Sequence, residues 1–158
     1  MNVFIMRHGD ANTEIQQDKE RPLTDVGILE TKVMAKWLKS ELINFDAVFV
    51  SPYLRAQQTA KTLANEMLLE VNLQTLNFIT PAGSASETHD YLDAIISLEK
   101  LNNVLVVSHM PLVSYLVAEM SVEKSSPIFA TASIAELNYD TAKMKGHIIR
   151  HIAPDDIC

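Results

Sequence analysis

Short runs of branched apolar residues alternate along the chain with longer segments whose apolar positions recur at helical spacing. Residues 3–6, 47–50 and 104–107 are apolar at every position, which is typical of strands buried on both faces. Residues 133–139 and 147–152 are predicted to form two later strands on either side of a turn that contains a glycine. These five segments are the predicted strands.

The segments between the strands have the pattern of amphipathic helices. In the first of them, Thr24 is placed to cap the helix N-terminus. Leu29, Val33 and Trp37 recur there at four-residue steps with Met34 and Leu38 beside them, and together they form the predicted apolar stripe. Further helices are predicted over residues 54–69, 86–100 and 111–120.

Alternation of strands and helices predicts an α/β fold, in which a mainly parallel sheet is covered on both faces by helices. Such sheets bind ligands just beyond the carboxyl ends of their strands. Three segments follow predicted strands and are therefore expected to meet at one edge of the sheet: residues 7–10, 51–55 and 108–111.

Composition limits the class of protein. With 158 residues, 47% hydrophobic and 21% charged, the chain is expected to form one globular domain over residues 1–158. The one cysteine, Cys158, cannot form an internal disulfide, which argues against a disulfide-stabilised secreted scaffold. A net charge of −7 argues against nucleic acid as a partner, because nucleic-acid binders present a basic face.

The N-terminal apolar run is too short for a signal peptide, and the longest apolar stretches have only strand length. We therefore expect a cytoplasmic protein that does not enter a membrane. We also expect it to be a monomer.

Each of the three predicted strand ends carries a side chain suited to phosphate chemistry: Arg7 with His8, then Arg55, then His109. Two guanidinium groups can hold phosphoryl oxygens in a fixed geometry, and a neutral histidine can attack phosphorus. The arginines would lower the pKa of His8 and keep it unprotonated near neutral pH. Gly9 would let the backbone approach the ligand closely.

These segments resemble a known family. Residues 6–9 (Met-Arg-His-Gly), 51–59 (Ser-Pro-Tyr-Leu-Arg-Ala-Gln-Gln-Thr) and 107–109 (Val-Ser-His) look like the motifs of the histidine phosphatase superfamily, and residues 21–27 match the stretch that usually follows its first motif. The short length is similar to that of the SixA-type phosphohistidine phosphatases. The resemblance implies the phosphoglycerate mutase-like fold, a three-layer α/β/α domain with a mixed, mostly parallel sheet of about six strands.

The resemblance also implies roles for individual residues. By the family's pattern His8 is the catalytic nucleophile, while Arg7, Arg55 and His109 bind the substrate phosphate, with Gly9 beside them.

Two positions depart from that pattern. The larger phosphatases and mutases usually carry a Glu general acid in a segment that corresponds to residues 76–83, where this chain has no carboxylate, and Glu14 replaces the family's Asn. A phosphate ester needs its leaving alkoxide protonated, whereas a phosphohistidine releases an imidazole, a much better leaving group. The departure therefore favours an N–P bond as the substrate, with a protonated His109 as the best available proton donor.

Three residues near the predicted site have alternative interpretations. Arg21 lies either at the pocket rim or in a surface salt bridge with Glu20 or Asp25. Ser51 and Ser108 either donate to the phosphate at the rim or cap the helices that follow them, and capping is the favoured interpretation.

Metal binding is not expected. Glu87, His89 and Asp90 are interpreted as a solvated helix start, and His147 and His151, predicted to share a strand face, have no suitably spaced partner to complete a site. No cofactor is expected either.

The sequence therefore predicts a metal-independent phosphohistidine phosphatase that removes phosphate from a phosphohistidine-bearing signalling or carrier protein. One alternative is a broader phosphomonoesterase or mutase that acts on a small metabolite, which the missing Glu disfavours. The other is a non-catalytic phosphohistidine-binding module, which an intact His8 disfavours.

Overall fold

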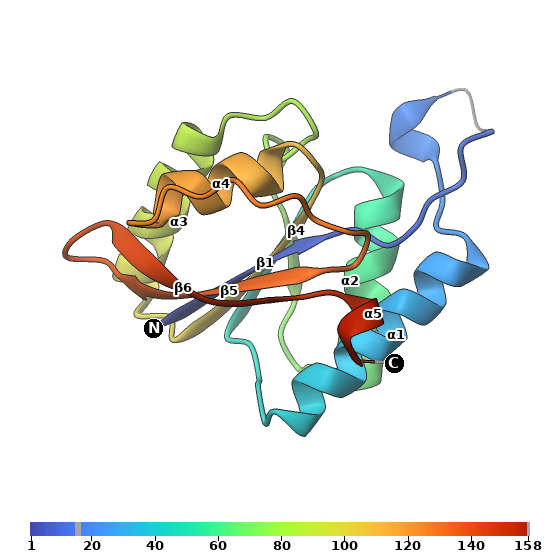
Figure 1. Cartoon of the computed structure of the whole chain (residues 1–158), viewed down its shortest axis with the longest axis horizontal. Helices are drawn as coiled ribbons and strands as arrows, with labels where there is room; N and C mark the ends of the chain where they lie inside the picture. The colour runs from blue at the N-terminus through green and yellow to red at the C-terminus, as the bar shows by residue number, and fades with distance from the viewer. Residues whose placement is uncertain (15–16, 158) are drawn as a thin grey trace.

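A mixed six-stranded sheet forms the centre of the computed structural model, which describes residues 1–14 and 17–157 (Figure 1). Its strands are β1 (Asn2–Arg7), β2 (Ala47–Val50), β3 (Leu73–Thr75), β4 (Asn103–Ser108), β5 (Ile134–Asp140) and β6 (Lys145–Ile152), in the order β3-β2-β4-β1-β5-β6. The first four strands run parallel, and β5 pairs antiparallel with both β1 and β6. The predicted fold class is confirmed.

Helices cover both faces of the sheet, as Figure 1 shows. On one face lie α3 (Ala85–Glu99) and α4 (Leu112–Met120), and on the other lie α1 (Asp25–Ser40), α2 (Leu54–Met67) and the short α5 (Pro154–Ile157). Each face of the sheet is packed in its own cluster of buried apolar side chains. This is the expected three-layer arrangement. Cys158 lies outside the described residues.

The start of α1 is as predicted, and its buried face agrees with the prediction only in part. The Thr24 hydroxyl accepts the N–H of Gly27, whereas Leu29 is 63% exposed and Val33 and Trp37 are only half-buried. Met34 and Leu38 are buried as predicted, and they share the buried face with the smaller residues Gly27, Thr31 and Ala35. The small residue Gly27 lets the first turn of α1 lie against the backbone of Asp10, so the buried face is shifted away from Leu29.

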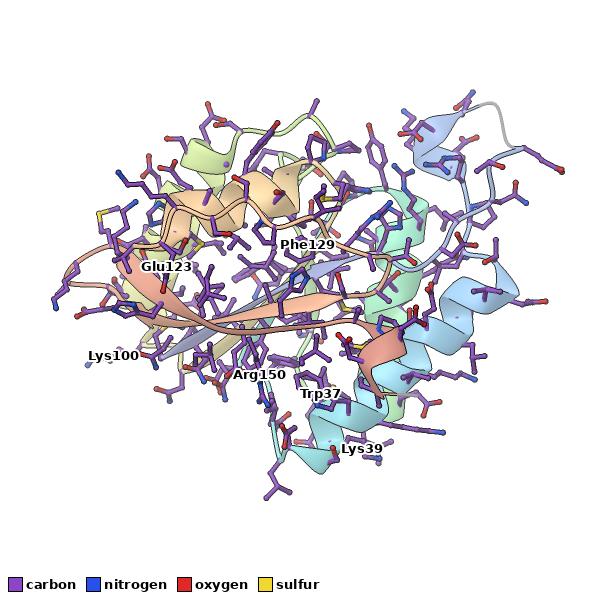
Figure 2. The ribbon with its side chains drawn as sticks, viewed as in Figure 1. Trp37, Lys39, Lys100, Glu123, Phe129 and Arg150 are labelled. Carbon is purple, nitrogen blue, oxygen red and sulfur yellow. The ribbon has the colours of Figure 1, made fainter. Side chains whose placement is uncertain are left out.

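Trp37 finds a different partner on the flank of α1. The guanidinium of Arg150, on β6, lies 4.8 Å from the centre of its indole ring, and Figure 2 shows both side chains where β6 runs alongside α1. A cation stacked on an aromatic face keeps the ring partly covered without placing it in the core.

Two further differences concern the sheet. The edge strand β3 escaped prediction because its residues are half-buried or exposed and two of them are polar. In β6 a bulge shifts the register, so that His147 pairs with Asn138 and His151 with Ala135. The extra residue breaks the two-residue alternation, so the two histidines lie on opposite faces rather than sharing one.

The carboxyl ends of β1, β2 and β4 meet at one edge of the sheet, as predicted. The N–H of His8 bonds the carbonyl of Ser108 at 3.0 Å, and that of Ser51 bonds the carbonyl of Val107 at 3.0 Å. A short 3₁₀ helix, η1 (Asp18–Glu20), lies near this edge and contacts α2. Among the described residues, no helix has the length and apolar character needed to cross a membrane.

Candidate active site

The three predicted strand-end segments bring His8, Arg55 and His109 together at this edge. All three side chains are buried, with 6%, 3% and 1% of their surfaces exposed. The two imidazole rings lie 5.1 Å apart between centroids, and the Nε of Arg55 donates a hydrogen bond to Nε2 of His8 at 3.2 Å. Residues distant in sequence therefore form one compact site.

The hydrogen bonds of His8 define which of its nitrogens can react. Its Nδ1 lies 2.6 Å from the carbonyl oxygen of Gly9, which can only accept, so Nδ1 carries the proton. Nε2 is then left with its lone pair and accepts the hydrogen bond from Arg55. This tautomer presents Nε2 as the nucleophilic atom.

The environment of His8 keeps the ring neutral. Burial lowers its pKa to about 4, with a further contribution from the charges of Arg55, Arg7 and Arg21, while the hydrogen bond to Gly9 works in the opposite direction. The predicted direction is therefore right, but desolvation contributes more than the arginines do.

Gly9 lies where β1 gives way to the loop that carries the site. Its N–H donates to the hydroxyl of Thr59, which in turn donates to the carbonyl of Arg55. This chain of two hydrogen bonds ties the backbone next to His8 to the first turns of α2, and so sets the distance between His8 and Arg55.

Arg7 is half-buried at the end of β1. Its Nη1 donates to the carbonyl of Phe129 at 2.7 Å, and its buried Nε has no hydrogen-bond partner among residues 1–14 and 17–157. Figure 2 places Phe129 in the segment between α4 and β5. Arg7 therefore keeps donors available for an anion.

Only one of the two ring nitrogens of His109 has a hydrogen-bond partner among the described residues. Its Nε2 lies 2.6 Å from the hydroxyl of Ser51, and its buried Nδ1 has no partner in the described part of the chain. The Ser51 oxygen already accepts the N–H of Tyr53 at 3.2 Å, and we assign the hydroxyl proton of Ser51 to a hydrogen bond with Nε2 of His109. This assignment puts the ring proton on Nδ1, where it can donate to a ligand.

The two serines do not act as the favoured interpretation predicted. The residues at the N-caps of α2 and α4 are Tyr53 and Pro111, and neither helix has a side-chain cap. Ser51 contacts His109 instead, and the hydroxyl of Ser108 donates to the carbonyl of Ile79 at 2.8 Å. Capping was the wrong interpretation, because buried hydroxyls at the sheet edge bond the nearest polar groups of neighbouring segments.

Arg21 forms an ion pair, but with neither of the predicted partners. Its Nε bonds Oδ1 of Asp18 at 2.9 Å, and its Nη1 bonds the carbonyl of Asn12. Asp18 also bonds Arg55, so Arg21 lies at the rim of the site through a shared carboxylate. The sequence-based prediction missed Asp18 because it belongs to no strand end and to none of the recognised motifs.

Tyr53 is a second residue that sequence reasoning missed. Its ring lies 5.0 Å from that of His109 and 5.1 Å from the guanidinium carbon of Arg55. Its position within residues 51–59 was a usable signal, since the first turn of α2 must face the strand ends.

In the part of the chain that the structure describes, no carboxylate takes the place of the absent general acid. Phe78 is half-buried against Tyr91, 5.4 Å away between ring centroids, and Glu14 and Glu87 are exposed. The loop over residues 76–83 still borders the site through the bond between Ser108 and Ile79. Asp18 is the one acidic side chain of the described residues that forms an ion pair with Arg55.

The histidines considered for metal binding have ordinary partners. His89 is buried rather than solvated and bonds the hydroxyl of Tyr139 at 2.8 Å, while His147 is exposed beside Glu123. Within residues 1–14 and 17–157, no three His, Cys, Asp or Glu side chains are grouped as a metal site requires.

Comparison with known proteins agrees with this geometry. The model of the histidine phosphatase superfamily, branch 1, matches residues 3–76. Phosphohistidine phosphatase SixA of Escherichia coli (strain K12) is 42% identical over 140 residues, which cover 89% of this chain and 86% of that protein. The SixA homolog of Haemophilus influenzae is 39% identical over 97% of this chain and 96% of its own.

Solved structures extend the similarity to the whole fold. The structure of the protein histidine phosphatase SixA complexed with tungstate matches with a TM-score of 0.96 at 39% identity, and covers 100% of both chains. The α-ribazole phosphatase of Shigella flexneri matches with a TM-score of 0.73 at 15% identity over 94% of both chains, which shows a shared fold alone.

Proposed function

Because the chain belongs to the histidine phosphatase superfamily, we propose that it is a phosphohistidine phosphatase that removes the phosphoryl group from a phosphohistidine-bearing protein. Two relatives that each match most of this chain carry that activity in their names. The geometry of His8 is the observation from this chain that carries the proposal: a buried neutral imidazole whose Nε2 faces Arg55.

In the first step, Nε2 of His8 attacks phosphorus in line with the bond to the substrate imidazole. The new N–P bond forms as the old one breaks, and the bonding pair leaves with the substrate ring, which departs as neutral imidazole because its other nitrogen carries a proton taken from solvent. His8 needs no base, because its Nε2 carries no proton at neutral pH, and the phosphoryl group takes over the hydrogen bond that Arg55 Nε donates to this nitrogen. The product of this step is a phosphorylated His8.

Arg7, Arg55 and His109 hold the oxygens of the transferring group. Arg55 presents Nε beside the nucleophile, Arg7 has an unpaired buried Nε, and the Nδ1–H of His109 is the remaining donor. Donors already oriented toward the phosphoryl oxygens stabilise the charge that develops on them without reorganising during the reaction. Water then attacks phospho-His8 and releases inorganic phosphate.

His109 serves in this scheme as a hydrogen-bond donor and not as an acid. Burial, together with the neighbouring His8 and Arg55, lowers its pKa to about 2, so the ring is neutral near pH 7. The expectation that a protonated His109 supplies the leaving-group proton has no support in this environment.

The choice between a phosphohistidine and a phosphate ester as substrate depends on whether an acid at the site can donate a proton to the leaving group. Burial works to raise the pKa of the Asp18 carboxyl, but hydrogen bonds from Arg21 and Arg55 lower it, which keeps Asp18 ionised. A leaving alkoxide would therefore find no carboxylic acid to protonate it among the described residues of the site, and the enzyme would forgo the roughly 10²–10⁴-fold contribution of general acid catalysis. A leaving imidazole needs far less help.

The experiment compares kcat/KM for a phosphohistidine-bearing protein, an activated aryl phosphate and a sugar phosphate. We expect phosphohistidine to react fastest, the aryl phosphate next and the sugar phosphate far behind. Equal rates for sugar phosphate and phosphohistidine would contradict the proposal and favour a broader phosphomonoesterase.

The single-domain organisation of residues 1–158, the monomeric state and the cytoplasmic location remain predictions from the sequence. Independence from metals belongs to the proposal, since the arginines supply the positive charge that a metal ion would otherwise provide.

A further inference from the structure

Asp18 lies between two arginines of the site and contacts both. Its Oδ2 accepts a hydrogen bond from Nη2 of Arg55 at 3.1 Å, and its backbone carbonyl accepts one from Nη1 of Arg55 at 2.6 Å. Its Oδ1 accepts from Nε of Arg21 at 2.9 Å. Both terminal nitrogens of Arg55 are therefore bonded to the same residue.

Because the guanidinium group of Arg55 is planar, its contact with Asp18 also fixes how the group is oriented. The five N–H donors of arginine form a rigid fork, and Nη1 and Nη2 share its end. Because Asp18 bonds that end, the side edge that carries Nε is turned toward Nε2 of His8, 3.2 Å away. This edge, with Nε and a second proton of Nη2, is the one that can meet a phosphoryl oxygen beside the nucleophile.

Asp18 also offsets part of the cost of burying the charge of Arg55. Its side chain is 3% exposed, and a buried cation without a partner is costly. Burial lowers the pKa of Arg55, while the hydrogen bond and charge of Asp18 raise it. The Asp18 side chain is itself 57% exposed, so the pair lies at the mouth of the site.

We propose that Asp18 is a positioning residue for phosphoryl transfer, holding Arg55 by its end so that the Nε edge faces the phosphoryl group as His8 attacks. The inference rests on the proposed function, because it takes Arg55 as a ligand of the transferring group. The carboxylate does not touch the reacting atoms in this scheme, and it acts through Arg55.

This role predicts opposite effects on turnover and on oxyanion binding. Replacing Asp18 by Asn removes a charge-assisted hydrogen bond that orients Arg55, so transition-state stabilisation falls. The same replacement removes a negative charge next to the place where an oxyanion binds, so binding of the anion itself is not weakened. If Asp18 were needed only for folding, its replacement would reduce both turnover and oxyanion binding.

The test measures kcat on the aryl phosphate and on the phosphohistidine protein, tungstate affinity by calorimetry, and Tm. For Asp18→Asn we expect kcat to fall about tenfold, the size of a lost charge-assisted hydrogen bond, with tungstate affinity equal to or tighter than that of the wild type. The matched control is Glu20→Gln, which makes the same charge change in η1 at an exposed residue outside the site and should leave kcat unchanged.

Two results would overturn the role of Asp18. One is a kcat in Asp18→Asn equal to that of the control. The other is a joint loss of kcat, tungstate affinity and Tm, which would mark Asp18 as merely structural.

A double-mutant cycle tests whether Asp18 acts through Arg55. In an Arg55→Lys background, which has no guanidinium to orient, Asp18→Asn should cost much less than in the wild type. An equal cost in both backgrounds would refute the mechanism.

Tungstate binding and aryl phosphate turnover do not require phosphohistidine to be the substrate. Failure of the wild type on phosphohistidine proteins would therefore count against the proposed function and leave the Asp18 test intact.

Discussion

Gly9 and Gly27 face each other backbone to backbone: a Cβ atom on Gly9 would lie 2.6 Å from the carbonyl oxygen of Gly27. A Cβ on Gly27 would in turn collide with the backbone of Asp10. The loop that carries His8 can therefore lie against the first turn of α1 only because neither position has a side chain. This contact explains why a glycine stands at the end of the segment 21–27.

Replacing Gly27 by Ala should push the start of α1 away from the loop next to His8. We expect a loss of roughly 1–3 kcal/mol in the free energy of unfolding, as for other overpacked sites, and a lower kcat. Chemical denaturation and steady-state kinetics would measure both. Val26→Ala, at an exposed neighbouring position, is the control and should change neither.

Replacing His8 by Ala should remove the phosphoenzyme. We expect activity to fall by at least about a thousandfold, as when other covalent nucleophiles are removed. Rapid quenching under non-acidic conditions with labelled substrate should trap label on wild-type His8 and none on the variant. His147→Ala, at an exposed histidine, should keep wild-type turnover. Near-normal turnover in His8→Ala would rule out the phospho-His8 route.

The pH profile of kcat/KM should reflect the neutral form of His8. Since burial lowers the pKa of His8 to about 4, the nucleophile remains unprotonated down to that pH. With an aryl phosphate, and after correction for the ionisation of the substrate, kcat/KM should stay level between pH 8 and about 5 and fall below that range. A decline centred near 6.5, the value of an ordinary histidine, would contradict the desolvated site.

Replacing Ser51 by Ala should release the ring of His109. Without the hydroxyl, nothing holds the proton on Nδ1, and a buried Nε2 loses its partner. We expect kcat to fall about tenfold, which corresponds to one lost hydrogen bond. Nitrogen-15 NMR of the His109 ring would report the change of tautomer. Ser51→Thr, which keeps the hydroxyl, should retain the wild-type nitrogen-15 signal of His109 and most of the wild-type kcat. A Ser51→Ala variant in which both kcat and the His109 signal are unchanged would count against this role.

Removal of divalent ions should leave activity unchanged. The charge at the site comes from Arg7 and Arg55, and the described residues contain no cluster of metal ligands. The measurement is turnover after exhaustive treatment with EDTA, compared with the untreated enzyme. Lost activity that returns with one added divalent ion would show that the arginines do not suffice.

The sequence by itself determined the framework that carries the site. The all-apolar segments around Phe4, Phe49 and Leu105 are strands in the structure, because a strand buried on both faces must be apolar throughout. Their carboxyl ends meet because parallel strands share one edge, and so His8 and His109 lie together as predicted. Local pattern was enough, since each of these conclusions depends on residues adjacent in the chain.

Only the tertiary structure decided the contacts between elements. Asp18 lies 37 positions from Arg55, and Ser51 lies 58 from His109, so neither pair leaves a mark in local spacing. The buried face of α1 was mispredicted in part for the same reason: Met34 and Leu38 turn inward as predicted, but the close approach at Gly27, and not the hydrophobicity of Leu29, decides where the rest of that face lies. Periodicity describes one element at a time, whereas the orientation of a side chain in the site depends on the neighbours that the folded chain brings to it.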